Sequence, residues 1–202
     1  ALLSLHARVA GVTAQAWEHR SLVQLWGPRY SDYVVAASDV AVFSLGRLPA
    51  HPSRATRAHT TADRLQAFLE GRRMPFGQAG HAMGVAPNSL RYATTTGRVL
   101  LRWDGARQPE VWMVPAPRME PARARLELAR RYLHVFGPAT AEGFARWAGL
   151  TAKEAATAFS ALAPELVAVR TPIGDTWMLA TDEPAVRAVA VPASNGEMGG
   201  SE

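Results

Sequence analysis

Few side chains in this sequence have the types and spacing of a catalytic or metal-binding group. Cysteine is absent, which removes disulfides, thiolate ligands and cysteine nucleophiles together. The histidines include no HExxH or similar ligand pair; they stand at positions 6, 19, 51, 59, 81 and 134. We therefore expect neither a metal nor a cofactor.

Acid–base or water-positioning chemistry has four candidates, His81, Asp32, Asp39 and Gln15. His81 has no evident partner, so a place on a helix surface or in the core is favoured over a role as general base. Asp32 or Asp39 could activate a water beside an extruded base, but a turn explains Asp32 and a helix cap explains Asp39. Gln15 is a lone glutamine and receives no role. The residues alone therefore identify no catalytic group.

Arginine is the residue type with the clearest chemical pattern. Of the 22 basic residues only Lys153 is a lysine, and guanidinium groups suit bidentate contacts with phosphate. Residues 54–107 carry nine arginines against three acids, whereas residues 1–53 have a net charge of +1 and residues 108–202 of −2. A GC-rich gene would explain the preference for arginine over lysine, but not the clustering. The middle of the chain is therefore the expected contact for a polyanion.

Bulk composition bounds the class of protein. A chain of 202 residues, 48% of them hydrophobic, can bury the core of one large domain or of a few small ones. It has no run of about eighteen apolar residues and no secretory leader, so we expect a monomeric, cytoplasmic, nucleoid-associated protein without membrane contact. The chain begins with Ala1 rather than Met, and we expect it to be a fragment.

An internal repeat governs how these side chains are positioned. When the chain is shifted by 65 residues, Gly84 falls on Gly149 and Trp112 on Trp177, with no gap between them. Each copy predicts a short helix that ends at a glycine, a tight turn, a second helix and a two-stranded hairpin. The expected ranges are 77–83, 89–95, 98–103 and 110–114 in the first copy, and 140–148, 152–162, 166–170 and 176–179 in the second.

Local signals support these elements. The second helix opens at a capping residue, Asn88 in one copy and Thr151 in the other, where Glu154 completes a capping box. Asp104-Gly105 gives the first hairpin a strong turn signal. A further helix precedes each copy, because apolar residues recur at three-to-four spacing over 62–73 and 121–136.

The beginning of the chain predicts the end of another such unit. Residues 21–26 and 33–36 favour a hairpin, followed by a helix from Ser38 or Asp39 to about Leu48. Helix, turn, helix and hairpin are typical of a winged helix, whose second helix enters the major groove. The expected fold is mainly α with small β-hairpins (α+β), in tandem winged-helix units. The expected divisions are a partial first unit (1–50), a linker (51–60), a second unit (61–117), a third unit (118–182) and a flexible tail (183–202).

Candidate DNA contacts follow from this fold. Arg102 and Arg107 flank the first hairpin turn, where a wing meets phosphates or a minor groove, unless Arg102 pairs with Asp104 on a solvated hairpin. The helix carrying Arg91 can contact guanine or phosphate, or be an ordinary polar face. The corresponding helix of the later copy is Ala-rich and more readily structural. The full expected set is Arg29, Asn88, Ser89, Arg91, Thr95, Arg98, Arg102, Arg107 and Lys153.

Tryptophan side chains are a second possible contact, because a displaced nucleotide can stack on them. Trp103, Trp112, Trp147 and Trp177 occupy positions on the predicted strands and helices, two of them in repeat register. We therefore expect these four to pack in the core instead.

Four stretches of the sequence match a known pattern: SLVQLWGPR (21–29), AASDVAVFSLGRLP (36–49), GRVLLRWDGARQPEVWMVP (97–115) and LARRYLHVFGPATAEGFARWAGLT (128–151). They resemble the bacterial winged-helix family that includes the AlkZ-type and YcaQ-type DNA glycosylases. The resemblance implies three tandem winged helices that form a concave surface for double-stranded DNA. It also implies excision of alkylated bases and unhooking of interstrand crosslinks.

The resemblance is incomplete at two places. Family members carry a Gln-x-Gln or Gln-x-Asp catalytic motif upstream of the strand at 21–29, and we expect that motif to lie outside this chain. The family's Arg-Gly-Thr-x-His corresponds to residues 29–33, Arg-Tyr-Ser-Asp-Tyr, where only the arginine is kept. The leading hypothesis is a DNA-repair glycosylase that hydrolyses the N-glycosidic bond of an alkylated purine. The alternatives are a non-catalytic DNA-binding protein or transcriptional regulator, and winged helices used for protein contacts.

Overall fold

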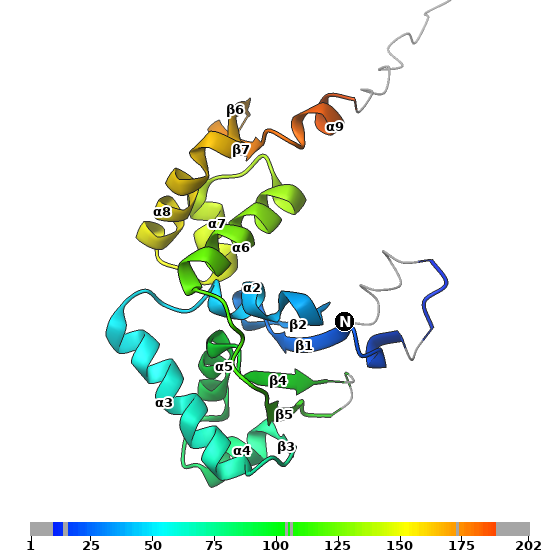
Figure 1. Cartoon of the computed structure of the whole chain (residues 1–202), viewed down its shortest axis with the longest axis vertical. Coiled ribbons are helices and arrows are strands. Elements are labelled where there is room, and N and C mark those ends of the chain that lie inside the picture. The colour runs from blue at the N-terminus through cyan, green and yellow to red at the C-terminus, as the bar shows by residue number, and fades with distance from the viewer. Residues whose placement is uncertain (1–9, 14–15, 104, 106, 173, 189–202) are drawn as a thin grey trace, which may run out of the picture.

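The computed structural model describes residues 10–13, 16–103, 105, 107–172 and 174–188 (Figure 1). Helices are combined with antiparallel strands in an α+β architecture. In these ranges none of the helices has the length and hydropathy needed to span a bilayer. Gln15, Asp104 and residues 189–202 of the predicted tail lie outside the described residues.

The N-terminal segment (residues 16–48) contains the predicted hairpin. Its strands β1 (Leu22–Trp26) and β2 (Asp32–Ala36) are antiparallel, and Trp26 lies opposite Asp32. The following helix is shorter than expected: a 3₁₀ turn (Ala37–Asp39) leads into α2 (Val40–Leu45), which ends at Leu45 rather than near Leu48. The hairpin prediction is confirmed and the helix prediction is too long at its C-terminal end.

The middle segment (residues 52–114) holds the first copy of the repeat. Its elements are α3 (Pro52–Leu69), β3 (Met74–Pro75), α4 (Phe76–Ala82), α5 (Leu90–Ala93), β4 (Val99–Arg102) and β5 (Glu110–Met113). Short 3₁₀ turns precede and follow α5, so residues 87–96 form one helical stretch. Gly84 has φ +67, the left-handed value predicted for a glycine that ends a helix.

The linker predicted at 51–60 is wrong. These residues belong to α3, which begins at Pro52 and continues through the helix expected at 62–73. Proline is suited to the first turn of a helix, where its missing N–H needs no partner. Ala58, Ala62, Leu65 and Leu69 are buried at three-to-four spacing and pack α3 against the sheet.

The C-terminal segment (residues 121–179) holds the second copy. Its elements are α6 (Pro121–Phe136), α7 (Ala141–Ala148), α8 (Ala152–Leu162), β6 (Leu166–Thr171) and β7 (Gly174–Leu179). The predicted bounds of α6 and α8 are confirmed. A short helix, α9 (Glu183–Arg187), follows at the start of the predicted flexible tail and corrects that prediction.

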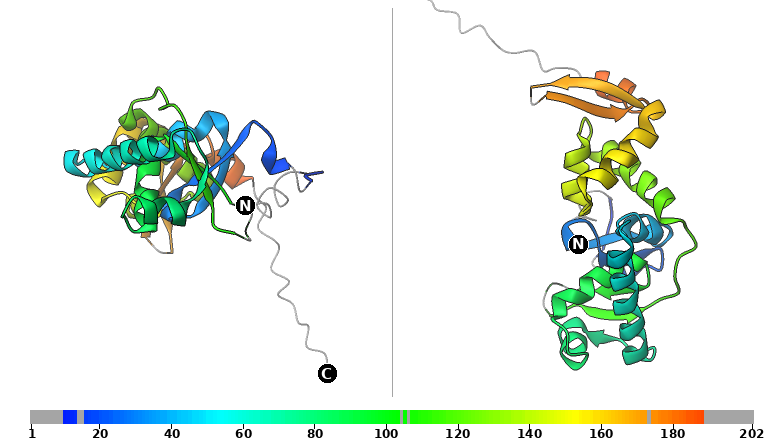
Figure 2. Two further views of the ribbon diagram at one scale, coloured as in Figure 1. Left: turned by 90° about the horizontal axis from the view of Figure 1, so that it is seen from below. Right: turned by 90° about the vertical axis from the view of Figure 1, so that its left-hand side faces the viewer.

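The two hairpins of the repeat belong to different sheets. Strands β4 and β5 lie in a five-stranded sheet of order β2-β1-β4-β5-β3, and Gln24 of β1 pairs with Leu101 of β4. Strands β6 and β7 form a separate two-stranded sheet among the described residues. Figure 2 shows β6 and β7 at one end of the molecule and α4 at the other. The N-terminal hairpin therefore extends the sheet of the middle segment rather than standing as a separate unit.

The five-stranded sheet is covered on both faces, as its alternating pattern requires. Trp26, Leu101 and Val111 point to the face packed by α3, α4 and α5. Leu25 and Leu100 point to the other face, where Trp112 and α2 cover them. Helix α2 also contributes Val42 to the core of the C-terminal segment, so it lies between the five-stranded sheet and that segment.

One buried arginine ties the N-terminal segment to the C-terminal segment. Arg47 is 2% exposed; its Nε donates to the Ala148 carbonyl at 2.9 Å and its Nη1 to the Trp26 carbonyl at 2.7 Å. Burial lowers the pKa of Arg47 to about 10, although Tyr30 and Tyr33 oppose this shift. The Glu154 carboxylate adds a second tie by accepting the Ala50 N–H at 2.6 Å.

The three predicted helix caps differ in outcome. Thr151 and Glu154 form the expected capping box at α8. Asn88 makes no capping bond, because the helical stretch already begins at Pro87. Asp39 makes none either; its carboxylate instead pairs with Arg131 of α6 at 2.6 Å.

The core assignment is wrong for two of the four tryptophans. Trp147 is buried, and Trp112 is partly buried against the sheet. Trp103 and Trp177 are 36% and 43% exposed. Among the described strands none pairs with the β6–β7 sheet as the N-terminal hairpin pairs with β4, and Trp177 is left partly exposed.

Candidate nucleic-acid interface

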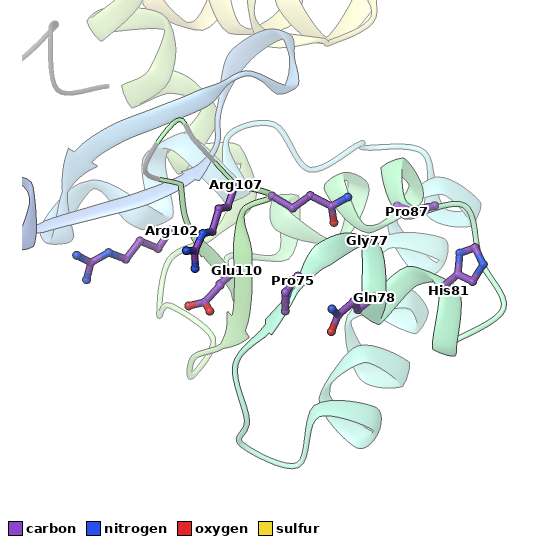
Figure 3. Close-up of a pocket in the computed structure, with 9 residues that line it drawn as sticks. Pro75, Gly77, Gln78, His81, Pro87, Arg102, Arg107 and Glu110 are labelled. Atoms are coloured by element: carbon purple, nitrogen blue, oxygen red, sulfur yellow. The ribbon is translucent and has the colours of Figure 1, made fainter.

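The β4–β5 hairpin and α4 border an open pocket of about 840 Å³ (Figure 3). Arg102, Arg107 and Glu110 line it from the hairpin, and Gln78 and His81 line it from α4. Guanidinium and amide groups of this kind donate hydrogen bonds to phosphates and base edges. The pocket therefore brings together the two predicted wing arginines with polar side chains from a second element.

The three arginines of this hairpin differ in their surroundings. Arg102 forms an ion pair with Glu18, and Arg107 is exposed, with its carbonyl accepting a hydrogen bond from Trp103. Arg98 donates to Asp63 of α3 at 2.5 Å, and its side chain is only 18% exposed. Arg98 thus holds β4 against α3, a structural role that the sequence did not predict.

The helical stretch at 87–96 presents only part of the predicted set. Asn88 is exposed and Ser89 is partly buried. Thr95 is 2% exposed, and its hydroxyl donates to the Tyr92 carbonyl, so it does not face solvent. Arg91 is turned inward, where its Nη1 donates to the Tyr30 carbonyl at 3.3 Å and its guanidinium lies 5.7 Å from the Trp26 ring. For Arg91 and Thr95 the expectation of an exposed polar face is therefore corrected.

The turn at residues 28–31 has an unusual backbone. Arg29 and Tyr30 have φ values of 56° and 53°, in the left-handed region that favours glycine. Tyr30 occupies the position of the glycine in the Arg-Gly-Thr-x-His pattern that corresponds to residues 29–33. Its ring meets the Tyr92 ring edge-on at 5.1 Å and lies 4.7 Å from the Arg47 guanidinium, and these contacts offset the backbone strain. Arg29 itself is exposed.

Asp32 lies beside this turn as the first residue of β2, not within the turn as predicted. Burial raises the pKa of its carboxyl, and the positive charge of Arg91 opposes that shift. Lys153 is far along the chain on α8, exposed next to the capping box. The structure therefore distributes the predicted contacts over the hairpin, α5, the 28–31 turn and α8, rather than on one helix.

Sequence reasoning missed a row of arginines on α3. Arg54, Arg57 and Arg64 are exposed on this helix, and spacings of three and seven residues place them on one side. They escaped notice because residues 51–60 were assigned to a linker. The signal that would have found them is Pro52, a typical first residue of a helix.

Comparison with known proteins assigns the chain to a family. A family model described as DNA glycosylase AlkZ-like matches residues 1–195. The chain belongs to the AlkZ-like DNA glycosylase family. This membership confirms the resemblance noted in the sequence.

A solved structure supports the fold assignment. Streptomyces sahachiroi DNA glycosylase AlkZ matches with a TM-score of 0.69 at 17% identity, over 91% of this chain and 60% of that chain. At this identity the likeness concerns the fold, and the chain spans about 60% of the AlkZ chain. A comparison with curated proteins gave no match. Within the described ranges, His, Asp and Glu side chains nowhere gather in groups of three that could hold a metal.

Proposed function

We propose that this protein is a DNA-repair glycosylase that grips duplex DNA with tandem winged-helix units and acts on alkylated or crosslinked bases. The observation that carries the proposal is the family match over residues 1–195. The concentration of positive charge at 54–107 supports it, because duplex DNA is a polyanion.

The order of elements supports the winged-helix part of the proposal. Both copies run helix, short extended segment, helix, helix and hairpin. The short segment pairs with the second hairpin strand each time: Met74 lies opposite Val111, and Ala139 forms a bridge with Trp177. In such a unit α5 or α8 is the recognition helix and the hairpin is the wing. We take the second unit to begin at Pro52 and the third at Pro121.

Six exposed or partly buried residues remain as proposed DNA contacts. The wing arginines Arg102 and Arg107 would meet phosphates or a minor groove. Asn88 and Ser89 are at the start of the recognition helix, where backbone N–H groups also favour a phosphate. Arg29 and Lys153 complete the set from the 28–31 turn and α8.

The chemical step needs a group that positions a water at the glycosidic carbon. The family resemblance places this task on a Gln-x-Gln or Gln-x-Asp motif, and no such motif occurs in the 202 residues. We therefore propose that the DNA-binding surface lies in this sequence and the catalytic motif outside it. Residues 29–33 keep only the arginine of the family's Arg-Gly-Thr-x-His pattern. This difference is the specific observation that favours the alternative, a non-catalytic DNA-binding protein or regulator.

The experiment compares binding with base release. Residues 1–202 are mixed with duplex DNA that contains 7-methylguanine, with binding followed by fluorescence anisotropy and free base by chromatography. We expect binding without release, and release when the chain is extended upstream to include a Gln-x-Gln or Gln-x-Asp. Release by residues 1–202 would place the catalytic group among them, with Asp32 the first to mutate. Absence of duplex binding would refute the proposed function, and an extended chain that binds without release would favour the regulator.

A further inference from the structure

The polar groups around Trp26 and Tyr30 are unusual for a protein interior. Among the described side chains, the buried polar atoms without a hydrogen-bond partner are Trp26 Nε1, Asp32 Oδ1, Arg47 Nη2 and Arg91 Nε. All four residues lie in one cluster: Asp32 is opposite Trp26 in the β1–β2 ladder, and both arginines contact Trp26. Buried polar groups are normally paired, so their concentration at one place points to a functional site.

A hollow of about 340 Å³ lies on the outer side of Tyr30, whose ring contacts the Arg47 guanidinium of this cluster. Its walls come from all three segments: Tyr30 from the N-terminal turn, Arg54 and Arg57 from α3, Tyr92 from α5 and Gly149 from the turn before α8. Gly149 has φ +75, the left-handed value that favours glycine at the end of α7, and it lies beside the Tyr30 ring. The hollow therefore lies where the middle and C-terminal segments meet.

The electrostatics of the hollow favour an anion. Arg54 and Arg57 make no ion pair with any carboxylate of the described residues, unlike Arg98 and Arg102 of the same segment. Behind the wall, the buried guanidinium of Arg47 lies 4.7 Å from the Tyr30 ring. A concave surface with buried and exposed cations focuses positive potential into the space between them.

A second hollow indicates what kind of anion would fit. It has a volume of about 270 Å³, shares Arg57 and Tyr92 with the first, and adds Arg64 and Ser89. Arg64 also donates to the Met83 carbonyl at 2.9 Å, which holds its side chain in place. Tyr92 is 52% exposed at the border of both hollows. A row of cation-lined hollows suits a ligand with regularly repeated charges, as in a nucleic-acid backbone.

We propose that the surface formed by Arg54, Arg57 and Tyr92 seats the phosphate backbone of duplex DNA. This inference rests on the proposed function and assigns to it a contact that neither the wing nor the recognition helix supplies. Arg54 and Arg57 bind phosphate directly, and Arg47 contributes a fixed charge from behind without touching DNA. Ser89, already a proposed contact, lines the neighbouring hollow.

The test is the salt dependence of duplex binding by wild type and by Arg54→Ala/Arg57→Ala, measured by fluorescence anisotropy. Each duplex phosphate contact contributes about 0.9 to the slope of log affinity against log salt, so the double variant should lose about 1.8. Between about 50 and about 200 mM salt, wild type should then lose roughly twelvefold more affinity than the variant. Arg54→Lys/Arg57→Lys should restore most of the slope, because it keeps the charges.

Arg118→Ala/Arg123→Ala is the matched control, since it removes the same charge from exposed positions outside both hollows. It should leave the slope nearly unchanged, and equal thermal melting of all variants excludes misfolding. If wild type binds DNA and the Arg54/Arg57 variant keeps its full slope, the inference is wrong while the proposed function stands. Equal losses in both alanine variants would also overturn it, because they would show a net-charge effect without a site. Failure of wild type to bind would refute the proposed function itself.

Discussion

The middle and C-terminal segments share one sequence pattern, yet their hairpins have different neighbours. In the middle segment β1 pairs with β4, and the N-terminal segment extends the sheet and covers its outer face. In the C-terminal segment β6 and β7 pair only with each other among the described strands. A repeat in sequence therefore fixes the order of elements, whereas the burial of each position depends on what packs beside the copy.

The strand pairing itself differs between the copies. Trp112 lies opposite Leu100. The shift of 65 would place Trp177 opposite Glu165, but Trp177 lies opposite Ala168, so the strand register of the second hairpin differs by three residues. The middle hairpin has a long connection between Arg102 and Glu110, and the C-terminal hairpin a tight one between Thr171 and Gly174. The long connection carries Arg107, so the difference in pairing also gives the middle hairpin a cation between its strands.

The two repeat tryptophans give the largest predicted difference in stability. Trp112 packs against the covered face of the sheet and beneath Arg73, whose guanidinium is 4.3 Å from its ring. Trp112→Ala should lower the free energy of unfolding by about 3 kcal/mol, within the range for buried aromatic truncations. Trp177→Ala should cost about 1 kcal/mol, because 43% of the Trp177 surface is already exposed to water and less apolar area is lost from the core. Urea unfolding followed by circular dichroism measures both changes.

Phenylalanine variants at the same positions control for loss of the indole alone, and each should lie between wild type and the alanine variant. Equal losses for the two alanine variants would show that the second hairpin is covered as well as the first, and would break the comparison.

The starts of the second helix in the two copies, the 87–96 stretch and α8, give a smaller predicted difference. Thr151→Ala should lower the free energy of unfolding by about 1 kcal/mol, since it removes the cap of α8. Asn88→Ala should change it by less than about 0.3 kcal/mol, because surface changes away from such features stay small. Thermal melting of the two variants and of Thr151→Ser, which keeps the hydroxyl, measures these effects. A larger loss for Asn88 than for Thr151 would contradict the assigned caps.

Local signals predicted the parts of the fold that depend on neighbouring residues. The bounds of α6 and α8 followed from apolar spacing and from the Thr151 capping box, which act within one helix. The inward position of Arg91 did not follow, because it depends on contacts with Trp26 and Tyr30, which are distant in sequence. The shared sheet could not be predicted either, because neither strand has a sequence feature that specifies the pairing of β1 with β4.

The candidate interface was predictable to a similar extent. Charge counting predicted a contact in the middle of the chain, and the turn signal predicted Arg102 and Arg107 at one hairpin, where both line the same pocket. Arg54 and Arg57 were missed because an incorrect helix start hid their common side. The partnerships of Arg98 with Asp63 and of Arg102 with Glu18 involve residues remote in sequence, so composition could not reveal them.

The most direct test of the central claim, that the middle segment supplies the main electrostatic contact with DNA, compares matched pairs of charges. Arg102→Ala/Arg107→Ala removes two cations from the middle hairpin, and Lys153→Ala/Arg170→Ala removes two from exposed positions of the C-terminal segment. In duplex binding measured against salt, the first variant should lose about 1.8 from the log–log slope and the second less than about half of that. An equal or larger loss in the C-terminal variant would contradict the claim and move the DNA surface to the second copy of the repeat.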